Sequence, residues 1–197
     1  MITFKTARRL IFVAALGPLA WLLYFAYQGD LTPNPIDYIS DTTGQSALWL
    51  LLLTLTVTPL RRLTKYNELI KLRRMLGLFA FFYACLHFTT WFVLDWFFDI
   101  ASMASDVVDR PFITIGMATF LLLIPLAVTS TAASIRRLGR RWTVLHRLTY
   151  VAAATAVIHF WWVVKADFRE PRLFGLALSM LFGFRLWWEY RTRSAVK

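Results

Sequence analysis

The chain has 197 residues, of which 58% are hydrophobic and 17% aromatic, and its formal net charge is +11. A soluble domain of this length could not bury so much apolar surface in one core. The basic residues stand in short blocks between apolar runs, and no polar segment is long enough to form a nucleic-acid-binding domain. Composition therefore excludes an ordinary soluble domain, argues against a nucleic-acid partner and predicts an all-α integral membrane protein.

The lone cysteine, Cys85, excludes an internal disulfide and an iron–sulfur cluster held by the thiolates of this chain. The N-terminus begins with Lys5, Arg8 and Arg9 ahead of an apolar run, an order that resembles a signal peptide. This run is long enough to span a bilayer and lacks a small-residue cleavage site. We therefore expect it to remain as the first transmembrane helix.

Six apolar segments approach the roughly 20 residues that a helix needs to cross a bilayer. In chain order they cover residues 10–27, 45–60, 75–95, 112–129, 143–165 and 172–189. Prolines stand in or beside several of the connections, where they favour helix ends, and Pro125 should kink the fourth span. The whole chain, residues 1–197, is predicted to be one six-helix transmembrane domain without an internal repeat.

Charge predicts how this bundle is oriented. Eighteen of the 22 Lys and Arg residues fall near the two termini and in the connections on the same side of the bundle. By the positive-inside rule this side is cytoplasmic, so both termini are expected in the cytoplasm of a bacterial inner membrane. Nine of the 11 Asp and Glu residues fall on or near the opposite face. That acidic face either docks a partner or steers a cation, or it reflects nothing more than avoidance of the basic loops.

The three histidines, His87, His146 and His159, lie inside or at the edge of apolar runs. Ionisable residues at membrane depth are costly unless they are satisfied, which makes them functional candidates. His87 lies 14 residues beyond Arg73, roughly 21 Å along a helix that rises about 1.5 Å per residue. His159 lies about 20 Å beyond His146 by the same rise. We therefore predict that His87 and His159 share one depth and supply both axial ligands of a b-type haem.

His146 is expected near the cytoplasmic end, where Arg73 or Arg74, and not a histidine, would face it from the third helix. Arginine is a poor iron ligand but suits a haem propionate, and Arg147 is a third candidate for that role. Thirteen residues of helix turn His159 about 140° away from His146, so the two do not share a face. His146 is therefore either a ligand of an inner haem or a polar boundary residue.

Seven segments carry a resemblance to a known family: 58–62 (TPLRR), 73–77 (RRMLG), 86–87 (LH), 110–116 (RPFITIG), 127–131 (AVTST), 138–150 (LGRRWTVLHRLTY) and 158–165 (IHFWWVVK). The sequence resembles the MsrQ (YedZ) family along nearly its whole length. These proteins are haem-binding membrane subunits of the periplasmic methionine sulfoxide reductase system MsrPQ. They belong to the ferric-reductase-like transmembrane superfamily.

The resemblance implies a membrane cytochrome b that passes electrons outward to MsrP, a soluble periplasmic molybdopterin enzyme. Such a chain is an electron-transfer subunit and is not itself the methionine sulfoxide reductase. By position, His87, His146 and His159 match the haem-associated histidines of the family. Relatives in the wider superfamily carry a second histidine about 14 residues before the equivalent of His87, where this sequence has Arg73. The number of haems, one or two, is therefore left open.

The electron donor is also left open. The sequence has no G-x-G-x-x-G fingerprint and no inner loop long enough for a flavin and nicotinamide domain, so we expect electrons from quinol or from a separate cytosolic flavin reductase. Arg136, Arg137, Arg140 and Arg141 either hold the phosphate of FMN as an additional cofactor or serve as topology signals. The alternative functions are a stand-alone ferric or quinone reductase and a proton-coupled transporter.

Overall fold

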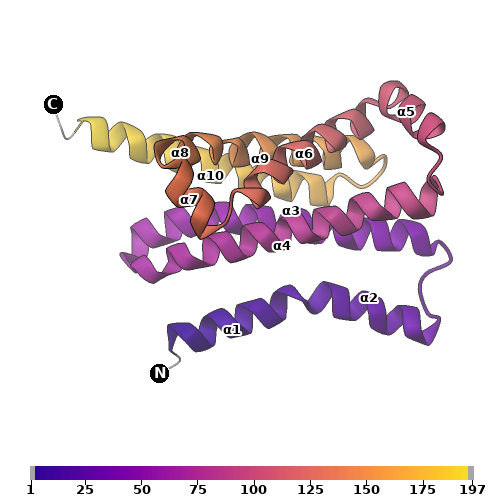
Figure 1. The fold of residues 1–197 in the computed structure, drawn as a ribbon, viewed down its shortest axis with the longest axis horizontal. Helices are drawn as coiled ribbons and strands as arrows, with labels where there is room; N and C mark the ends of the chain where they lie inside the picture. The colour runs from indigo at the N-terminus through magenta and orange to yellow at the C-terminus, as the bar shows by residue number, and fades with distance from the viewer. Residues whose placement is uncertain (1–2, 195–197) are drawn as a thin grey trace.

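The computed structural model of the chain describes residues 3–194, and within this range every regular element is a helix. The longer helices run roughly along the long axis of the molecule, and short, oblique helices lie toward its two ends (Figure 1). The predicted all-α class is confirmed for these residues. The elements are α1 (Phe4–Ala15), α2 (Gly17–Gln28), α3 (Pro35–Thr64), η1 (Asn67–Leu69), α4 (Ile70–Thr89), the π-helix η2 (Thr90–Asp95), α5 (Ile100–Asp109), α6 (Pro111–Val128), α7 (Ala132–Leu138), α8 (Arg140–Leu145), α9 (Leu148–Val163) and α10 (Arg169–Ser194).

Four helical stretches among residues 3–194 are long and apolar enough to cross a membrane, and they correspond to the first four predicted spans. They are Phe4–Gln28, Pro35–Thr64, Asn67–Asp95 and Pro111–Val128. The other two predicted spans, 143–165 and 172–189, are not among these four stretches. Helix α9 has 16 residues, and the predicted span within α10 contains Arg172, Arg185 and Glu189. The chain is thus a multi-helix membrane protein, while the count of six remains a prediction.

Helix α3 is much longer than the predicted span 45–60. It begins at Pro35, where a proline is tolerated because the first turn of a helix has N–H groups without helical partners. It ends before Lys65, which adopts a left-handed conformation with φ of 57°. The sequence prediction missed the first ten residues because they are polar. In the structure, Ser40 and Gly44 from this stretch line an internal cavity.

The predicted fifth helix over 143–165 is wrong at its start, because the chain turns between α8 and α9. His146 caps α8, and bonds between residues three apart replace the α-helical pattern at this junction, from Arg147 N–H to Val144 C=O (3.1 Å) and from Tyr150 N–H to Arg147 C=O (3.0 Å). The Thr149 hydroxyl also donates to the His146 carbonyl, at 2.9 Å. His146 and His159 therefore do not share one continuous helix.

Helix α5 was not predicted, since ten residues are too few for a span. Asp99 caps its first turn by accepting hydrogen bonds from the Ser102 N–H (3.2 Å) and hydroxyl (2.6 Å). These two donors lower the pKa of the Asp99 carboxyl. A short amphipathic helix capped in this way runs beside the start of α6.

The first membrane stretch is broken into α1 and α2 at Gly17 and Pro18. Proline has no N–H and interrupts the helical ladder, so nearby backbone groups need other partners. The Tyr83 hydroxyl inserts here: it donates to the Ala15 carbonyl at 2.8 Å and accepts from the Leu19 N–H at 3.2 Å. These are the two groups that an unbroken helix would join directly. Tyr83 on α4 is fully buried and so fixes the first helix pair against the bundle.

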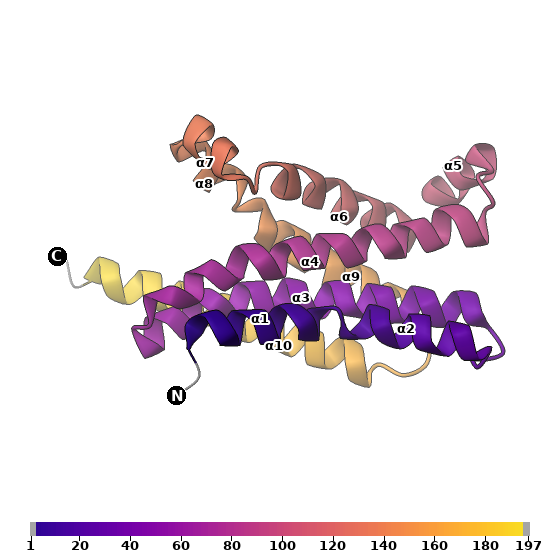
Figure 2. The ribbon, with the colours of Figure 1, turned by 60° about the horizontal axis from the view of Figure 1, so that its bottom comes forward.

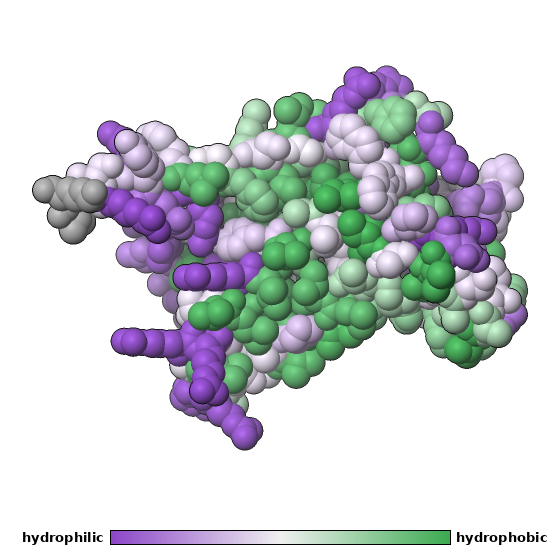
Figure 3. Space-filling model, turned by 90° about the horizontal axis from the view of Figure 1, so that it is seen from above, coloured by the Kyte–Doolittle hydropathy of each residue, from purple (hydrophilic) through white to green (hydrophobic). Residues whose placement is uncertain are grey.

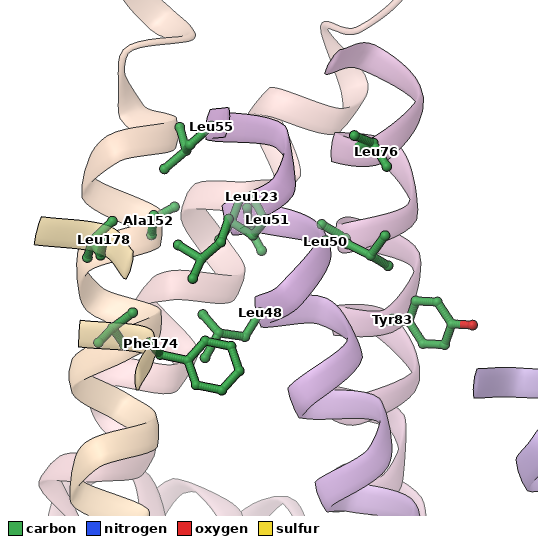
Figure 4. Close-up of a cluster of buried hydrophobic side chains, with 14 of the residues drawn as sticks. Leu48, Leu50, Leu51, Leu55, Leu76, Tyr83, Leu123, Ala152, Phe174 and Leu178 are labelled. Carbon is green, nitrogen blue, oxygen red and sulfur yellow. The ribbon is translucent and has the colours of Figure 1, made fainter. Parts of the chain in front are cut away.

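The core lies where α3, α4, α6, α9 and α10 meet, and leucine side chains fill much of it (Figure 4). Helix α3 packs along α4, and α6 packs along α9, as Figures 1 and 2 show for the first pair. Ala152 and Ala153 on α9 have no exposed surface. Small residues such as these allow close helix approach, which drives association where lipid gives no hydrophobic gain.

The two ends of the bundle are hydrophilic and the middle is hydrophobic (Figure 3). Helix α1 begins and α10 ends at the same end, together with the α3–α4 connection and α7–α8 (Figure 1). The predicted basic blocks therefore gather at one end of the molecule. The α2–α3 and α9–α10 connections and α5 lie at the other end, as expected for the acidic face.

We expect the substitution Tyr83→Phe to destabilise the protein by about 1–3 kcal/mol, because it leaves the buried Ala15 carbonyl and Leu19 N–H without partners. Unfolding of the detergent-solubilised protein by denaturant measures this change. Tyr27→Phe is the matched control, since Tyr27 is 89% exposed. Equal stability of the two variants would show that the Tyr83 hydroxyl does not support the broken helix.

Candidate functional site

His87 on α4 and His159 on α9 face one another inside the bundle. Their ring centres are 6.2 Å apart and the ring planes lie at 71°. An imidazole nitrogen binds a transition metal at roughly 2 Å, and the ring centre lies about 1 Å further back. Two imidazoles on opposite sides of one metal ion therefore have ring centres about 6 Å apart, by the same distances. The observed spacing fits a metal held between the two rings.

Each of these two rings is oriented by a backbone carbonyl of the neighbouring helix. His87 Nδ1 lies 2.9 Å from the Ser40 carbonyl of α3, and His159 Nδ1 lies 2.6 Å from the Phe112 carbonyl of α6. A carbonyl can only accept, so in both neutral rings the proton is on Nδ1 and the lone pair is on Nε2. This is the tautomer that binds a metal through Nε2 while a second group holds the other nitrogen.

Two glycines give the rings room. A Cβ atom on Gly44 of α3 would lie 3.1 Å from the ring of His87, and a Cβ on Gly116 of α6 would lie 2.7 Å from His159 Cε1. Contacts under 3.0 Å do not occur for real Cβ atoms. The ring of His87 thus lies directly against the backbone of α3, and the ring of His159 lies directly against the backbone of α6.

Both histidines line a cavity of about 590 Å³ between α3, α4, α6 and α9. This volume lies in the range of cofactor pockets, roughly 300–1,000 Å³. The walls are largely apolar and aromatic. Phe88 and Phe120 stack in parallel, with ring centres 4.7 Å apart and planes at 7°. A flat, apolar macrocycle whose metal takes two axial imidazoles suits such a space.

Five charged residues line the same cavity, namely Asp37, Asp41, Asp95, Asp106 and Arg110. They come from the end of the molecule that the sequence predicted to be acidic. Arg110 is the cation among them and pairs with the buried carboxylate of Asp106, with Nε 2.8 Å from Oδ1. The cavity is therefore polar at this end and apolar around the two histidines.

The π-helix η2 shapes the cavity on this side. Wider π turns are rare and occur often at functional sites. Here the turn places Trp91 at the cavity wall, where its indole N–H donates to Asp106 Oδ2 at 3.4 Å. The chain then passes through Phe97 and Phe98, which both have positive φ, 45° and 66°. The segment between α4 and α5 is thus held in an unusual backbone conformation beside the candidate site.

His146 is not part of this pair. Its Nε2 lies 3.0 Å from the Thr129 hydroxyl, and its ring stacks on Trp142 with centres 3.9 Å apart. Arg73 is near enough for its charge to act on His146, as the sequence predicted, while the side chains of Arg74 and Arg147 are exposed. The structure therefore places His146 and Arg73 together and apart from His87 and His159.

Sequence reasoning missed several residues that build these two regions. Ser40, Gly44, Phe112 and Gly116 support the histidine pair. At the basic end, the guanidinium of Arg62 lies 5.2 Å from the ring centre of Trp188, and that of Arg185 lies 4.3 Å from the ring centre of Tyr150. A glycine within an apolar helix is a signal for close approach, but it does not say to which residue. The two arginines are visible in the sequence, but only the packing of α3, α9 and α10 shows which aromatic rings they contact.

Comparison with known proteins gives consistent matches. Residues 43–157 match the family described as "Ferric reductase like transmembrane component". A protein of Herminiimonas arsenicoxydans is 51% identical over 95% of this chain and 87% of its own length. Relatives in Ralstonia nicotianae and Xanthomonas campestris pv. campestris are 46% and 45% identical, each over 95% of this chain and 88% and 87% of their own lengths. All three relatives are named protein-methionine-sulfoxide reductase heme-binding subunit MsrQ. No solved structure matches the chain.

We expect Asp106→Ala to destabilise the polar end of the cavity, because it removes the acceptor shared by Trp91 and Arg110. Loss of a buried carboxylate that holds two donors should cost about 1–3 kcal/mol. Denaturant unfolding in detergent measures the loss. Asp109→Ala on the same helix is the control, since Asp109 is exposed and accepts from Ser105 alone among the described residues. If both variants unfold at the same denaturant concentration, the contacts of Asp106 with Trp91 and Arg110 do not stabilise the polar end of the cavity.

Proposed function

Because this chain belongs to the ferric reductase-like transmembrane family, and within it to the heme-binding MsrQ subunits of protein-methionine-sulfoxide reductases, we propose that it is a b-type cytochrome of such a system. It passes electrons across the bacterial inner membrane to MsrP, the periplasmic molybdopterin enzyme. MsrP then returns oxidised methionine in proteins to its apolar form. The whole chain, residues 1–197, forms one transmembrane haem domain in this proposal.

The facing pair of His87 and His159 is the observation that carries the proposal. The two rings stand at the spacing of axial ligands, both line a cavity of cofactor size, and both have Nδ1–H held by a carbonyl, which leaves Nε2 free to bind a metal. Haem b bound between them would supply one-electron chemistry. The residues of the chain orient the two ligands and surround the site with largely apolar and aromatic walls.

A second, inner cofactor site at the basic end is the alternative that His146 and Arg73 offer. In this proposal His146 ligates or supports an inner haem, and Arg73, Arg74 and Arg147 are candidate partners of propionate groups. Two observations weigh against a ligand role: the Nε2 of His146 is already bonded to Thr129, and its ring stacks on Trp142. One haem, at His87 and His159, is therefore the occupancy that the geometry supports best.

Electrons enter at the basic end, which faces the cytoplasm together with both termini. The donor is either quinol or a separate cytosolic flavin reductase. Arg136 and Arg137 on α7 and Arg140 and Arg141 on α8 are the candidate partners of an anionic group at this end, such as the phosphate of FMN. Electrons leave at the acidic end, where charged residues line the cavity that holds His87 and His159.

A second candidate function is a stand-alone ferric or quinone reductase. The large family to which residues 43–157 belong carries the ferric-reductase name, so an electron acceptor other than MsrP deserves a direct test. The chemically reduced protein is mixed either with MsrP and methionine sulfoxide or with ferric citrate. Fast reoxidation by MsrP alone supports the first function, and reoxidation by ferric citrate alone supports the second.

We expect the purified protein to show the α band of a b-type cytochrome in a reduced-minus-oxidised spectrum, with about one haem per chain. His87→Ala and His159→Ala should each abolish its low-spin signal, because each removes one axial ligand. Cys85→Ala, two residues before His87 on α4, is the control and should leave the spectrum unchanged. A normal spectrum in both histidine variants would overturn the ligand assignment.

His146→Ala separates the two haem counts. With one haem per chain, this variant should retain the full haem content and spectrum. A protein with about two haems that falls to one on this substitution would assign His146 to an inner haem. The pyridine haemochrome assay, together with the protein concentration, measures the haem content of each variant.

A further inference from the structure

The rings of His87 and His159 are held in the same way, each by one backbone carbonyl and one glycine of the neighbouring helix. In each case Nδ1 bonds a carbonyl that lies 47 residues earlier in the chain, Ser40 for His87 and Phe112 for His159. In each case a glycine stands four residues after that carbonyl and lies against the ring, Gly44 or Gly116. All three positions of the second set follow their counterparts by 72 residues.

The glycine and the carbonyl are linked by helix geometry. Every Cα–Cβ bond of an α-helix tilts toward the N-terminus, so a side chain at one position covers the backbone of the preceding turn. A residue four positions after a carbonyl therefore partly shields that carbonyl. With glycine at this position, the carbonyl of Ser40 or Phe112 is open to a ring N–H from the next helix, while it also accepts the usual helical bond.

The crowding at these two positions is specific. A Cβ on Gly116 would meet three atoms of His159 at 2.7, 2.8 and 3.2 Å, and a Cβ on Gly44 would meet two atoms of His87 at 3.1 Å. The same atom on Gly77 of α4 would be 3.7 Å from Thr54, an ordinary contact, and on Gly183 of α10 it would meet nothing within 4 Å. Glycine is unfavourable within a helix, so the two crowded positions need a reason that the other two lack.

We propose that Gly44 and Gly116 are positioning residues for the histidine pair: each opens one helix carbonyl to Nδ1–H and so fixes the tautomer and the direction of Nε2. The inference rests on the proposed haem at His87 and His159 and goes beyond it, since it assigns a role to two residues that have no side chain to ligate a metal. The two helix pairs, α3 with α4 and α6 with α9, then provide two equivalent half-sites. A hydrogen bond from Nδ1–H also raises the basicity of the ligating nitrogen.

Traces of this equivalence remain in the sequence. Thr42-Thr43-Gly44 and Thr114-Ile115-Gly116 share the pattern T-x-G, and His87-Phe88 and His159-Phe160 share H-F, at the same offset of 72 residues. The residues around these positions differ, which is why no internal repeat was predicted. The equivalence lies in the backbone geometry around each histidine.

The test compares Gly116→Ala and Gly44→Ala with the wild type by electron paramagnetic resonance, visible spectra and binding of carbon monoxide. Displacement of an axial ring should convert low-spin haem to a high-spin form that binds carbon monoxide and should weaken haem binding roughly 10–100-fold. The effect should be larger for Gly116→Ala, whose contact is the shorter. Gly77→Ala and Gly183→Ala are the controls and should keep the wild-type spectrum. Wild-type spectra in both Gly116→Ala and Gly44→Ala would overturn the proposal.

A double-mutant cycle on the haem-free protein tests the same contact without the cofactor. Gly116→Ala should lower the thermal midpoint of the haem-free protein by several degrees in the wild-type background and should have no such effect with His159→Ala, because the clashing ring is then absent. An equal loss in both backgrounds would contradict the assigned contact. This readout also separates the two hypotheses: a wild type without haem would refute the proposed function, while the cycle would still report on the contact.

Discussion

An imidazole inside an apolar helix bundle needs an acceptor for its N–H, and this requirement organises the centre of the protein. The backbone carbonyls of Ser40 and Phe112 satisfy it for His87 and His159. A helix carbonyl can be reached by a ring only if the two helices are close and the covering side chain is missing. The tight packing of α3 on α4 and of α6 on α9, and glycines at 44 and 116, meet both conditions. The cavity lies where these two helix pairs meet.

The same need to satisfy backbone groups explains the places where helices are interrupted. At the break beside Pro18 the Tyr83 hydroxyl bridges the Ala15 carbonyl and the Leu19 N–H, which an unbroken helix would join directly. At the junction after His146, the Thr149 hydroxyl and bonds between residues three apart replace the helical pattern. Non-helical backbone at membrane depth is tolerated only with such partners. Each interruption is therefore stabilised by a hydroxyl side chain of the protein, Tyr83 at the first and Thr149 at the second.

Charge divides the molecule along its long axis. Arginines gather at the end that holds His146, whereas the carboxylates of Asp37, Asp41, Asp95 and Asp106 line the cavity that holds His87 and His159. The hydrophobic middle between the two ends matches a bilayer (Figure 3). The buried pair of Asp106 and Arg110 shows that the acidic end is also built by specific contacts.

The sequence by itself determined the helical class, the membrane setting, the gathering of basic residues at one end and the common depth of His87 and His159. These follow from hydropathy and from a constant rise per residue, which are properties of one segment at a time. Only the tertiary structure decided that α3 begins at Pro35 and that the Tyr83 hydroxyl bridges the helix break beside Pro18. It also decided that His146 lies apart from the other two histidines, and that Gly44 and Gly116 leave space for their rings. Each of these depends on contact between segments distant in the chain, and local patterns of hydrophobicity and turn residues carry no record of such contacts.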